Sequence, residues 1–279
     1  MLPKIPKRKR DTNKGDYGKV LVVAGSVGMA GAAYLAASGA HRAGAGLVYL
    51  ATPKSIYNVL AKKLFCTVIH PMPQTPRGAL SNPIPILELT KKCGSAAIGP
   101  GISHNPKTAK VVRTLISKLL LPFVLDADGL NCISNNPSIL RRAKAPIVIT
   151  PHPGELSRLI KTSVNKIQRN RQAIAIKTAK LYNVIVLLKG HNAIVTDGKN
   201  VYVNKTGNPG MATGGSGDIL TGIIATFLAQ GFSPFDSACL GAHIHGLAGD
   251  LACKKFGETS LIATDILNYL PDAFKRYSK

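Results

Sequence analysis

The chain has 279 residues, 45% of them apolar and 27 of them glycine, which is enough to bury a large core as one big domain or two small ones. Its 36 Lys and Arg against 13 Asp and Glu give a formal net charge of +23, which indicates a polyanionic ligand or simply a basic surface. Only 5% aromatic residues, with no interleaving of aromatic and basic side chains, argue against a dedicated RNA-binding protein and a nucleic-acid partner.

The ends and the apolar runs of the chain exclude further classes. No apolar stretch reaches the roughly 18 residues that a membrane span requires, so we expect a soluble protein without a membrane partner. The N-terminus has basic residues but no apolar core behind them, so it is no secretory signal, and a cytoplasmic location follows. We expect a disordered basic tail over residues 1–13 and one domain over residues 14–279, because Pro3 and Pro6 break any helix there.

Short β-branched runs alternate with longer helical patterns, which predicts an α/β fold of three layers, a mostly parallel central sheet with helices on both faces. The expected strands are 20–24, 46–51, 96–98, 123–126, 147–150, 184–189, 193–196 and 201–203. The expected helices are 31–44, 53–63, 106–119, 136–142, 153–160, 165–181, 217–230, 234–255 and 262–274. The last two strands flank Asp197-Gly198, a turn pair typical of hairpins, so we expect an antiparallel edge there.

The first glycine cluster, Gly25 to Gly31, follows the first strand and opens a helix, where backbone N–H groups can hold an anion. It is not the dinucleotide pattern Gly-x-Gly-x-x-Gly, and no acid ends the second strand, which argues against a classical nicotinamide oxidoreductase. The phosphate-binding pattern Gly-x-x-x-x-Gly-Lys-Ser/Thr is also missing from the sequence. The spacing supports a tight turn without a ligand as well as it supports an anion site.

Polar residues follow several other strands. Asp126 and Asp128 end a buried strand, where two carboxylates can hold Mg²⁺ or one can cap the helix beginning near Leu130. We favour the cap for at least one of them. His152, held between two prolines, suits a ligand-contacting loop. Lys189 before Gly190 is placed to meet a phosphate, and a solvent-facing lysine is an equal alternative.

The strongest signal is the stretch 208–222, in which glycines precede the single carboxylate of Asp218 at the start of an apolar helix. Bare backbone N–H groups and the helix dipole form a site for a polyphosphate. The dipole is expected to hold Asp218 as an anion, ready to accept a hydroxyl proton beside the phosphate being transferred. A helix cap by Asp218 or Ser216 is the alternative, but a cap does not require Gly210, Gly214, Gly215 and Gly217 as well.

The residues from Thr206 to Asp218 resemble the anion-hole motif of the ribokinase-like superfamily. The wider set resembles the ADP/ATP-dependent NAD(P)H-hydrate dehydratases, which repair nicotinamide nucleotides, and covers nearly the whole chain in order. It comprises Lys14–Gly18, Ala24–Ala33, Gly99–Gly101, Leu125–Asn131, Thr150–Glu155, Val186–Gly190, the glycine-rich stretch and Gly241–Gly249. The motifs that best distinguish this family from the rest of the superfamily are Lys-Gly-x-Tyr-Gly and Thr-Pro-His-Pro-Gly-Glu.

The resemblance implies a lyase that returns the hydrated cofactors (S)-NADHX and (S)-NADPHX to NADH and NADPH at the expense of ADP or ATP. In that scheme the hydrate's hydroxyl is phosphorylated and phosphate is then eliminated. Asp218 would contact the hydrate and act as the catalytic base. The other hydrate contacts would be Ala32, Gly101, His152, Pro153, Gly154 and Glu155. The nucleotide would be held by Lys189, Gly190, His191, Asn192, Ala193, Asn208, Gly210, Gly214, Gly215, Ser216 and Gly217.

The resemblance also implies Mg²⁺ with the nucleotide and assembly as a homotetramer. It leaves ADP and ATP open, and we favour ADP because many animal members lack the Thr-Pro-His-Pro-Gly-Glu form seen here. The superfamily's Asn-x-x-Glu magnesium motif is not evident, so the metal ligands stay unassigned. Many bacterial members carry an epimerase domain before the dehydratase, and we expect that activity in a separate protein. The alternatives are a vitamin-precursor kinase of the hydroxyethylthiazole or hydroxymethylpyrimidine type and, more remotely, a basic RNA-binding protein.

Overall fold

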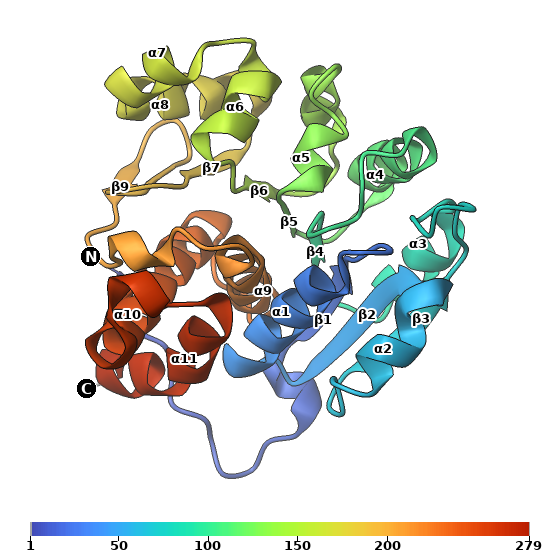
Figure 1. Cartoon of the computed structure of the whole chain (residues 1–279), viewed down its shortest axis with the longest axis horizontal. Coiled ribbons are helices and arrows are strands. Elements are labelled where there is room, and N and C mark those ends of the chain that lie inside the picture. Colours follow the sequence, from blue (N-terminus) through green and yellow to red (C-terminus); the bar gives the residue numbers. More distant parts are fainter. Residues whose placement is uncertain (1, 279) are drawn as a thin grey trace.

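The computed structural model describes residues 2–278, and a nine-stranded sheet runs through its centre (Figure 1). The strand order is β3-β2-β1-β4-β5-β6-β7-β8-β9, and every pair from β3 to β7 is parallel. The strands are β1 Lys19–Val23, β2 Leu47–Pro53, β3 Val68–Met72, β4 Ser95–Ile98, β5 Phe123–Leu125, β6 Ile147–Ile149, β7 Ile185–Leu188, β8 Ile194–Thr196 and β9 Val201–Val203. The predicted α/β class with a mostly parallel sheet is confirmed.

The antiparallel edge is also confirmed. Strands β7, β8 and β9 pair antiparallel, and Gly198 in the β8–β9 turn has φ of 92°, a value that glycine adopts without strain. The strand β3 was not predicted, because Pro71 interrupts its pattern. Since β3 lies at the outer edge of the sheet, the missing N–H of a proline there costs no ladder hydrogen bond to a further strand.

Helices cover both faces of the sheet (Figure 1). On one face pack α3 Ile84–Thr90, α4 Pro106–Lys118, α5 Asp128–Asn131, α6 Pro153–Ile160, α7 Val164–Arg169 and α8 Arg171–Tyr182. On the other face pack α1 Ala30–Arg42, α2 Tyr57–Ala61, α9 Ser216–Ala229 and α10 Pro234–Ser260, with α11 Ala263–Tyr277 outside α9 and α10. Short 3₁₀ turns are Lys14–Tyr17, Lys54–Ile56, Pro137–Arg142 and Pro209–Met211.

Several predicted helices differ from those observed: 53–63 is a 3₁₀ turn followed by α2, and 136–142 is the 3₁₀ turn Pro137–Arg142. The expected helix 165–181 is broken into α7 and α8 at Asn170, whose φ of −134° is not helical. Helix α10 contains a kink at Gly257, where φ is 72°. Helix α3 was not predicted, because it is short and lies in a proline-rich segment that gives no sustained helical period.

The basic N-terminal segment follows a defined path over residues 2–13, which differs from the expected disordered tail. Leu2 and Ile5 pack against the apolar cluster of α9, α10 and α11, and the Tyr277 hydroxyl donates to the Pro3 carbonyl. Arg8 donates to the Gly44 carbonyl and lies over the ring of Tyr17. Within residues 2–278, no helix has the length and apolar character that crossing a bilayer demands.

The parallel strands bring distant segments to one edge. Because β1, β4, β5, β6 and β7 run in the same direction, the loops that follow them meet at the carboxyl edge of the sheet. The N-terminus of α9 points to the same edge, since α9 packs under β1, β4 and β5. The polar residues singled out in the sequence therefore fall into one region.

Candidate functional site

A buried carboxylate, Asp126, lies at the centre of this edge. Its Oδ1 accepts a hydrogen bond from Lys189 Nζ at 2.8 Å, and its Oδ2 accepts one from Thr221 Oγ1 at 2.7 Å. Asp126 follows β5, Lys189 follows β7 and Thr221 belongs to α9, so this one carboxylate joins the sheet to the helix. Asp126 is only 1% exposed, and hydrogen bonds to both oxygens offset the free-energy cost of removing its charge from water.

The sequence allowed Lys189 either to contact a phosphate or to face solvent. The solvent-facing alternative is wrong. Its side chain is only 20% exposed, and its Nζ also lies 3.7 Å from Glu155 Oε2. Burial opposes the charge of the ammonium, but Asp126 and Glu155 outweigh it and raise the pKa of Lys189. Lys189 is therefore a fixed cation in the site.

The expected cap by Asp126 or Asp128 is also wrong. Helix α5 begins at Asp128, its N-cap position is Ala127, and no side chain caps it. The Asp128 carboxylate turns instead toward the loop after β4, where it accepts from Ser103 N at 2.9 Å and pairs with His104. Sequence spacing could not reveal these partners, because they come from different strands.

Asp218 lies in the first turn of α9 and is partly buried beside this group. A Cβ on the preceding residue, Gly217, would lie 3.2 Å from Lys189 Nζ and 3.6 Å from Asp126 Oδ2. Burial, and then repulsion by Asp126, raise the pKa of Asp218 to about 7, although Lys189 lowers it. The raised pKa differs from the expectation of a readily ionised Asp218, because burial and a neighbouring acid favour the neutral form.

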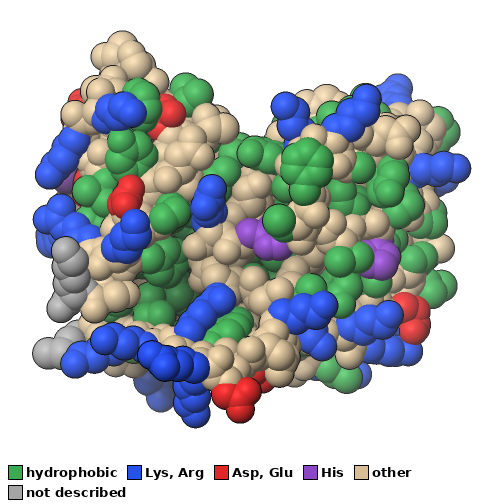
Figure 2. Space-filling model, turned by 90° about the horizontal axis from the view of Figure 1, so that it is seen from below, with side chains coloured by type: hydrophobic (Ala, Val, Ile, Leu, Met, Phe, Trp, Pro, Cys, Tyr) green, Lys and Arg blue, Asp and Glu red, His purple; other side chains and the backbone are tan. Residues whose placement is uncertain are grey.

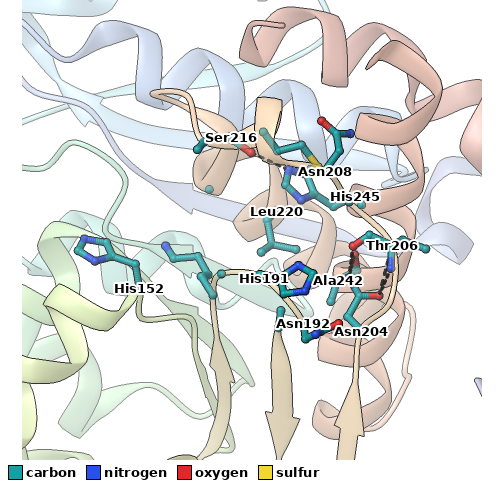
Figure 3. Close-up of a pocket in the computed structure, with 18 of the residues that line it drawn as sticks. His152, His191, Asn192, Asn204, Thr206, Asn208, Ser216, Leu220, Ala242 and His245 are labelled. Atoms are coloured by element: carbon teal, nitrogen blue, oxygen red, sulfur yellow. Dashed lines mark hydrogen bonds between the residues drawn. The ribbon is translucent and has the colours of Figure 1, made fainter. Parts of the chain in front are cut away.

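The start of α9 carries no side-chain cap, so both cap readings of this stretch are wrong. Its N-cap residue is Gly215, with φ of 90° and no side chain to offer. Ser216 turns away from the helix amides, and its Oγ lies 3.2 Å from Nε2 of His245 (Figure 3). The N–H groups of the first turn therefore have no side-chain acceptor, which is the condition for holding an anion.

The glycines of the stretch 208–222 are required for different structural reasons. A Cβ on Gly210 would lie 2.7 Å from the Glu258 carbonyl oxygen, and one on Gly215 would lie 2.3 Å from Leu35 Cδ1. Packing against backbone requires Gly210, whereas the φ of 90° is the stronger reason for Gly215, because the Leu35 side chain could shift. A Cβ on Gly217 would approach Lys189 and Asp126, as described above. Nothing lies within 4 Å of a Cβ on Gly214. Only Gly214 and Gly217 still favour a ligand over packing.

A cavity of about 680 Å³ opens between the β7–β8 turn, the segment 204–213 and the start of α9 (Figure 3). This volume is typical of small-molecule sites. Of the predicted nucleotide contacts, those that line it are Lys189, Gly190, His191, Asn192, Ala193, Asn208, Ser216 and Gly217. Gly210, Gly214 and Gly215 do not. Leu187, Thr206, Met211 and Ala242 also line it and lie within the motif segments, although they were not named singly as contacts. The sequence provided no such indication for Asn204 and Leu220.

The segment 204–213 is held by side chains that carry no motif. Asp250 on α10 accepts from Gly207 N at 2.9 Å and from Asn208 Nδ2 at 3.0 Å. Asn204 Nδ2 donates to the carbonyls of Thr206 and Ala242. Asn208 therefore anchors the wall of the cavity, and Asp250 is a structural partner that spacing in the sequence did not reveal.

His245 and Gly246, neighbours on α10, have different roles. Gly246 serves packing, since a Cβ there would lie 2.3 Å from Thr206 Oγ1. His245 lines the cavity, and burial lowers its pKa to about 4, so it is a neutral partner of Ser216 at physiological pH.

The predicted hydrate contacts fall into two segments. A Cβ on Gly101 would lie 2.8 Å from Cβ of Ala32, so these two residues adjoin. The other segment starts α6: His152 Nδ1 accepts from Gly154 N at 3.0 Å, Pro153 is the first helical residue, and Glu155 Oε2 accepts from His152 N at 2.8 Å. Glu155 also faces Lys189, so this segment adjoins the charged group around Asp126.

The turn after β1 favours the reading without a ligand. Gly25 N donates to the Pro100 carbonyl and Val27 N to the Gly78 carbonyl, so these amides are occupied. Ser26 Oγ donates to the Gly101 carbonyl at 2.8 Å. This turn fixes the Gly99–Gly101 loop and with it the Ala32 side of the site.

Comparisons with known proteins agree with this geometry. The family model described as NAD(P)H-hydrate dehydratase matches residues 20–272. The chain is 45% identical over 271 residues to the bifunctional NAD(P)H-hydrate repair enzyme of Moorella thermoacetica, across 96% of this chain and 51% of that protein. It is 35% identical over 263 residues to the ADP-dependent (S)-NAD(P)H-hydrate dehydratase of Neisseria meningitidis serogroup B, across 93% of this chain and 86% of that protein. The chain thus spans about half the length of the bifunctional relatives it matches.

Solved structures give the same picture. An ADP/ATP-dependent NAD(P)H-hydrate dehydratase from Bacillus subtilis, co-crystallised with ATP and Mg²⁺, superposes with a TM-score of 0.83 at 27% identity, across 98% of this chain and 95% of that chain. The hydroxyethylthiazole kinase of Pyrococcus horikoshii superposes with a TM-score of 0.62 at 16% identity, across 94% of this chain and 89% of that chain. The second likeness shows the ribokinase-like fold alone.

Proposed function

The chain belongs to the NAD(P)H-hydrate dehydratase family, and from this premise we propose that it is a lyase that dehydrates (S)-NADHX and (S)-NADPHX to NADH and NADPH while consuming ADP or ATP. One observation carries the proposal within the structure. A carboxyl group with a pKa of about 7, Asp218, stands at an uncapped helix N-terminus that borders both the cavity and the cation Lys189.

We assign the first step to phosphoryl transfer. Asp218 accepts the proton of the hydrate's hydroxyl while that oxygen bonds to the terminal phosphorus of the nucleotide. The bond from that phosphorus to the bridging oxygen breaks, so ADP leaves as AMP. The free N–H groups of α9 and the Lys189 ammonium stabilise the charge that develops on the phosphoryl oxygens.

The second step is elimination. The carbon–oxygen bond of the phosphorylated hydrate breaks, phosphate leaves with the electron pair, and the neighbouring ring carbon loses a proton as the double bond forms. The departing phosphate takes up the ring proton, and Asp218 releases the hydroxyl proton to solvent. The sum is hydrate plus ADP giving the reduced cofactor, AMP, phosphate and one proton, so the atoms balance without an oxidant.

The residues present fit a Mg²⁺ ion that arrives with the nucleotide. Within residues 2–278, no group of three or more His, Cys, Asp and Glu side chains is arranged to hold a metal. Mg²⁺ commonly uses one or two carboxylates together with substrate phosphates and water, so it needs no such group. The phosphates and water would supply most of the ligands of the ion, so Asp218 stays available as the base. When bound, the ion would neutralise phosphate charge.

ADP is the nucleotide we propose, supported by the name of the Neisseria relative, although the Bacillus relative is named for both nucleotides. A cytoplasmic location, assembly as a homotetramer and an epimerase that converts the R hydrates stay predictions. The Ala32 and His152 segments and the cavity residues keep their proposed roles toward the hydrate and the nucleotide.

The deciding experiment incubates the protein with enzymatically hydrated NADH and Mg²⁺, adding ADP or ATP in separate reactions, and follows the absorbance of reduced nicotinamide. We expect NADH to reappear, faster with ADP. No recovery with either nucleotide would reject the dehydratase, and phosphorylation of hydroxyethylthiazole or hydroxymethylpyrimidine would establish the kinase instead. Tight, salt-sensitive RNA binding without turnover would favour the remote alternative.

A further inference from the structure

Beside the site lies a hydrogen-bonded group of side chains that the proposed mechanism does not use: His104, Asp128, Asn131 and Arg158. Arg158 Nε donates to Asn131 Oδ1 at 2.9 Å. Asn131 Nδ2 lies 3.1 Å from His104 Nε2 and 3.5 Å from Asp128 Oδ1. His104 comes from the loop after β4, Asp128 and Asn131 from α5, and Arg158 from α6, so three segments converge.

The hydrogen bonds decide which atoms are left for a ligand. Both Asp128 oxygens are engaged, Oδ2 by Ser103 N and Oδ1 by His104 and Asn131, and the Asp128 side chain is 15% exposed. The His104 side chain is 63% exposed, and Arg158 is exposed too. Only Nε of the Arg158 guanidinium has a partner among the described residues, so the two Nη groups present their N–H bonds outward. The negative charge is enclosed and the donors face solvent.

The group connects the two segments predicted to contact the hydrate. Ser103, whose amide meets Asp128, follows Gly101 by two residues. On the other side, a Cβ on Gly154 would lie 3.8 Å from Arg158 Nη1. Burial and then the charges of Lys189 and Arg158 lower the pKa of His152, which agrees with a guanidinium facing that segment. Arg158 therefore adjoins the His152 segment, and through Asn131 and Asp128 it is linked to the loop that follows Gly101.

We infer that Arg158, oriented by Asn131 and Asp128 and assisted by His104, forms a subsite for a phosphoryl group of the dinucleotide hydrate. This rests on the proposed function. A guanidinium presents paired donors that match two oxygens of a phosphoryl group, and a fixed side chain loses little entropy when it binds. The hydrates offer this chemistry in two places, the pyrophosphate of both and the 2′-phosphate that only NADPHX carries. Asn131 and Asp128 are positioning residues.

The test uses Arg158→Gln, which removes the charge, and Arg158→Lys, which keeps the charge without the paired donors. Arg142→Gln is the matched control, because Arg142 is an exposed arginine on the 3₁₀ turn Pro137–Arg142. With ADP saturating, we expect Arg158→Gln to raise KM for the hydrate roughly tenfold or more, with Arg158→Lys between it and the native protein. The value of kcat and the KM for ADP should stay within about twofold, as expected when only ground-state binding of one ligand is lost.

The two hydrates separate the sources of the phosphoryl group. An equal rise with NADHX and NADPHX assigns the pyrophosphate, and a rise with NADPHX alone assigns the 2′-phosphate. An unchanged KM for both hydrates overturns the subsite, as does an equal rise in KM for ADP. Asn131→Ala should raise KM in the same direction as Arg158→Gln with a smaller factor, and no change there would reject its positioning role.

Binding of NADH and NADPH to the resting protein, measured by calorimetry, keeps this result distinct from the proposed function. If no hydrate is turned over but Arg158→Gln weakens dinucleotide binding, the subsite stands and the dehydratase fails. If the native protein turns over hydrate and Arg158→Gln behaves like Arg142→Gln, the dehydratase stands and the subsite fails. Absence of dinucleotide binding by the native protein in both measurements rejects the subsite.

Discussion

At the scale of single residues, the chemistry depends on the balance between the ionised and the neutral form of Asp218. The N-terminus of α9 favours its ionised form, whereas burial and the Asp126 carboxylate favour the neutral form. The second pair of effects wins, and the pKa rises to about 7 rather than falling. A carboxylate with such a pKa is a stronger base than an ordinary aspartate and is still largely ionised slightly above neutral pH.

The first prediction follows from this value. Because the base must be ionised, kcat/KM for the hydrate should fall as pH drops through about 7, by roughly tenfold per pH unit below it. The measurement is a pH–rate profile at saturating ADP. Asp218→Asn should lose activity by roughly 10²–10⁴-fold while still binding nucleotide. Full activity of that variant, or an acid limb near the ordinary aspartate value, would contradict the assignment.

A second prediction concerns stability. The folded pKa of Asp218 lies above its unfolded value of 3.8, so the ionised form costs stability. That cost is fully present above about pH 7, shrinks as the pH falls toward 4, and is absent below 4. Asp218→Asn should therefore raise Tm at pH 8, by roughly 2–4 °C for each kcal/mol removed, and give no gain at acidic pH. A melting series across pH checks the sign, and an equal gain at all pH values would point to packing instead.

At the scale of elements, the position of α9 depends on small residues where it crosses α1. A Cβ on Gly222 would lie 2.1 Å from the Ala36 carbonyl oxygen, and one on Gly39 would lie 2.6 Å from the Ile219 carbonyl oxygen. The two backbones therefore touch, and Thr226 Oγ1 donates to the Ala40 carbonyl across the same contact. This close approach holds the N-terminus of α9 against the carboxyl edge of the sheet.

The third prediction tests that contact with a matched pair of glycines. Gly222→Ala must push α1 and α9 apart, so it should destabilise the fold by roughly 1–3 kcal/mol, although alanine favours a helix by up to about 1 kcal/mol. Gly214→Ala has nothing within 4 Å and a negative φ, so its free energy of unfolding should change little. Chemical denaturation measures both. Equal stabilities of the two variants would disprove the packing role of Gly222.

At the scale of the whole molecule, the charge is unevenly placed. Four of the 13 acidic residues lie in or beside the site: Asp126, Asp128, Glu155 and Asp218. Their negative charges therefore do not offset the positive charge of the surface. On the face shown in Figure 2, Lys and Arg side chains clearly exceed Asp and Glu. Both proposed ligands are polyanions, so this field favours their approach.

The fourth prediction is a salt effect on binding. Raising the ionic strength to about 1 M shortens the screening length to about 3 Å, so the long-range attraction disappears while buried pairs such as Lys189–Asp126 persist. KM for the hydrate and for ADP should both rise with salt, and kcat should change little. Steady-state kinetics across a salt series, with a neutral osmolyte as the control, provides the measurement. A fall in kcat at constant KM would contradict this role of the surface charge.

Much of the fold could be read from the sequence, because local patterns report local structure. Alternating β-branched and helical runs predicted most of the sheet, and Asp197-Gly198 predicted the hairpin between β8 and β9. The edge strand β3 was missed because Pro71 hides its pattern, and the break at Asn170 was missed because the helical period continues across it. In both places a single backbone feature overrode the periodicity.

The sequence by itself determined the family, the sheet and the place of the glycine-rich helix start, since these depend on neighbours along the chain. Only the tertiary structure decided which side chains meet: that Asp126 holds Lys189 and Thr221, that Asp250 holds the cavity wall, and that Arg158 faces Gly154. It also decided the protonation of Asp218. A pKa depends on burial and on charges contributed by other strands, and spacing along one chain segment carries no record of either.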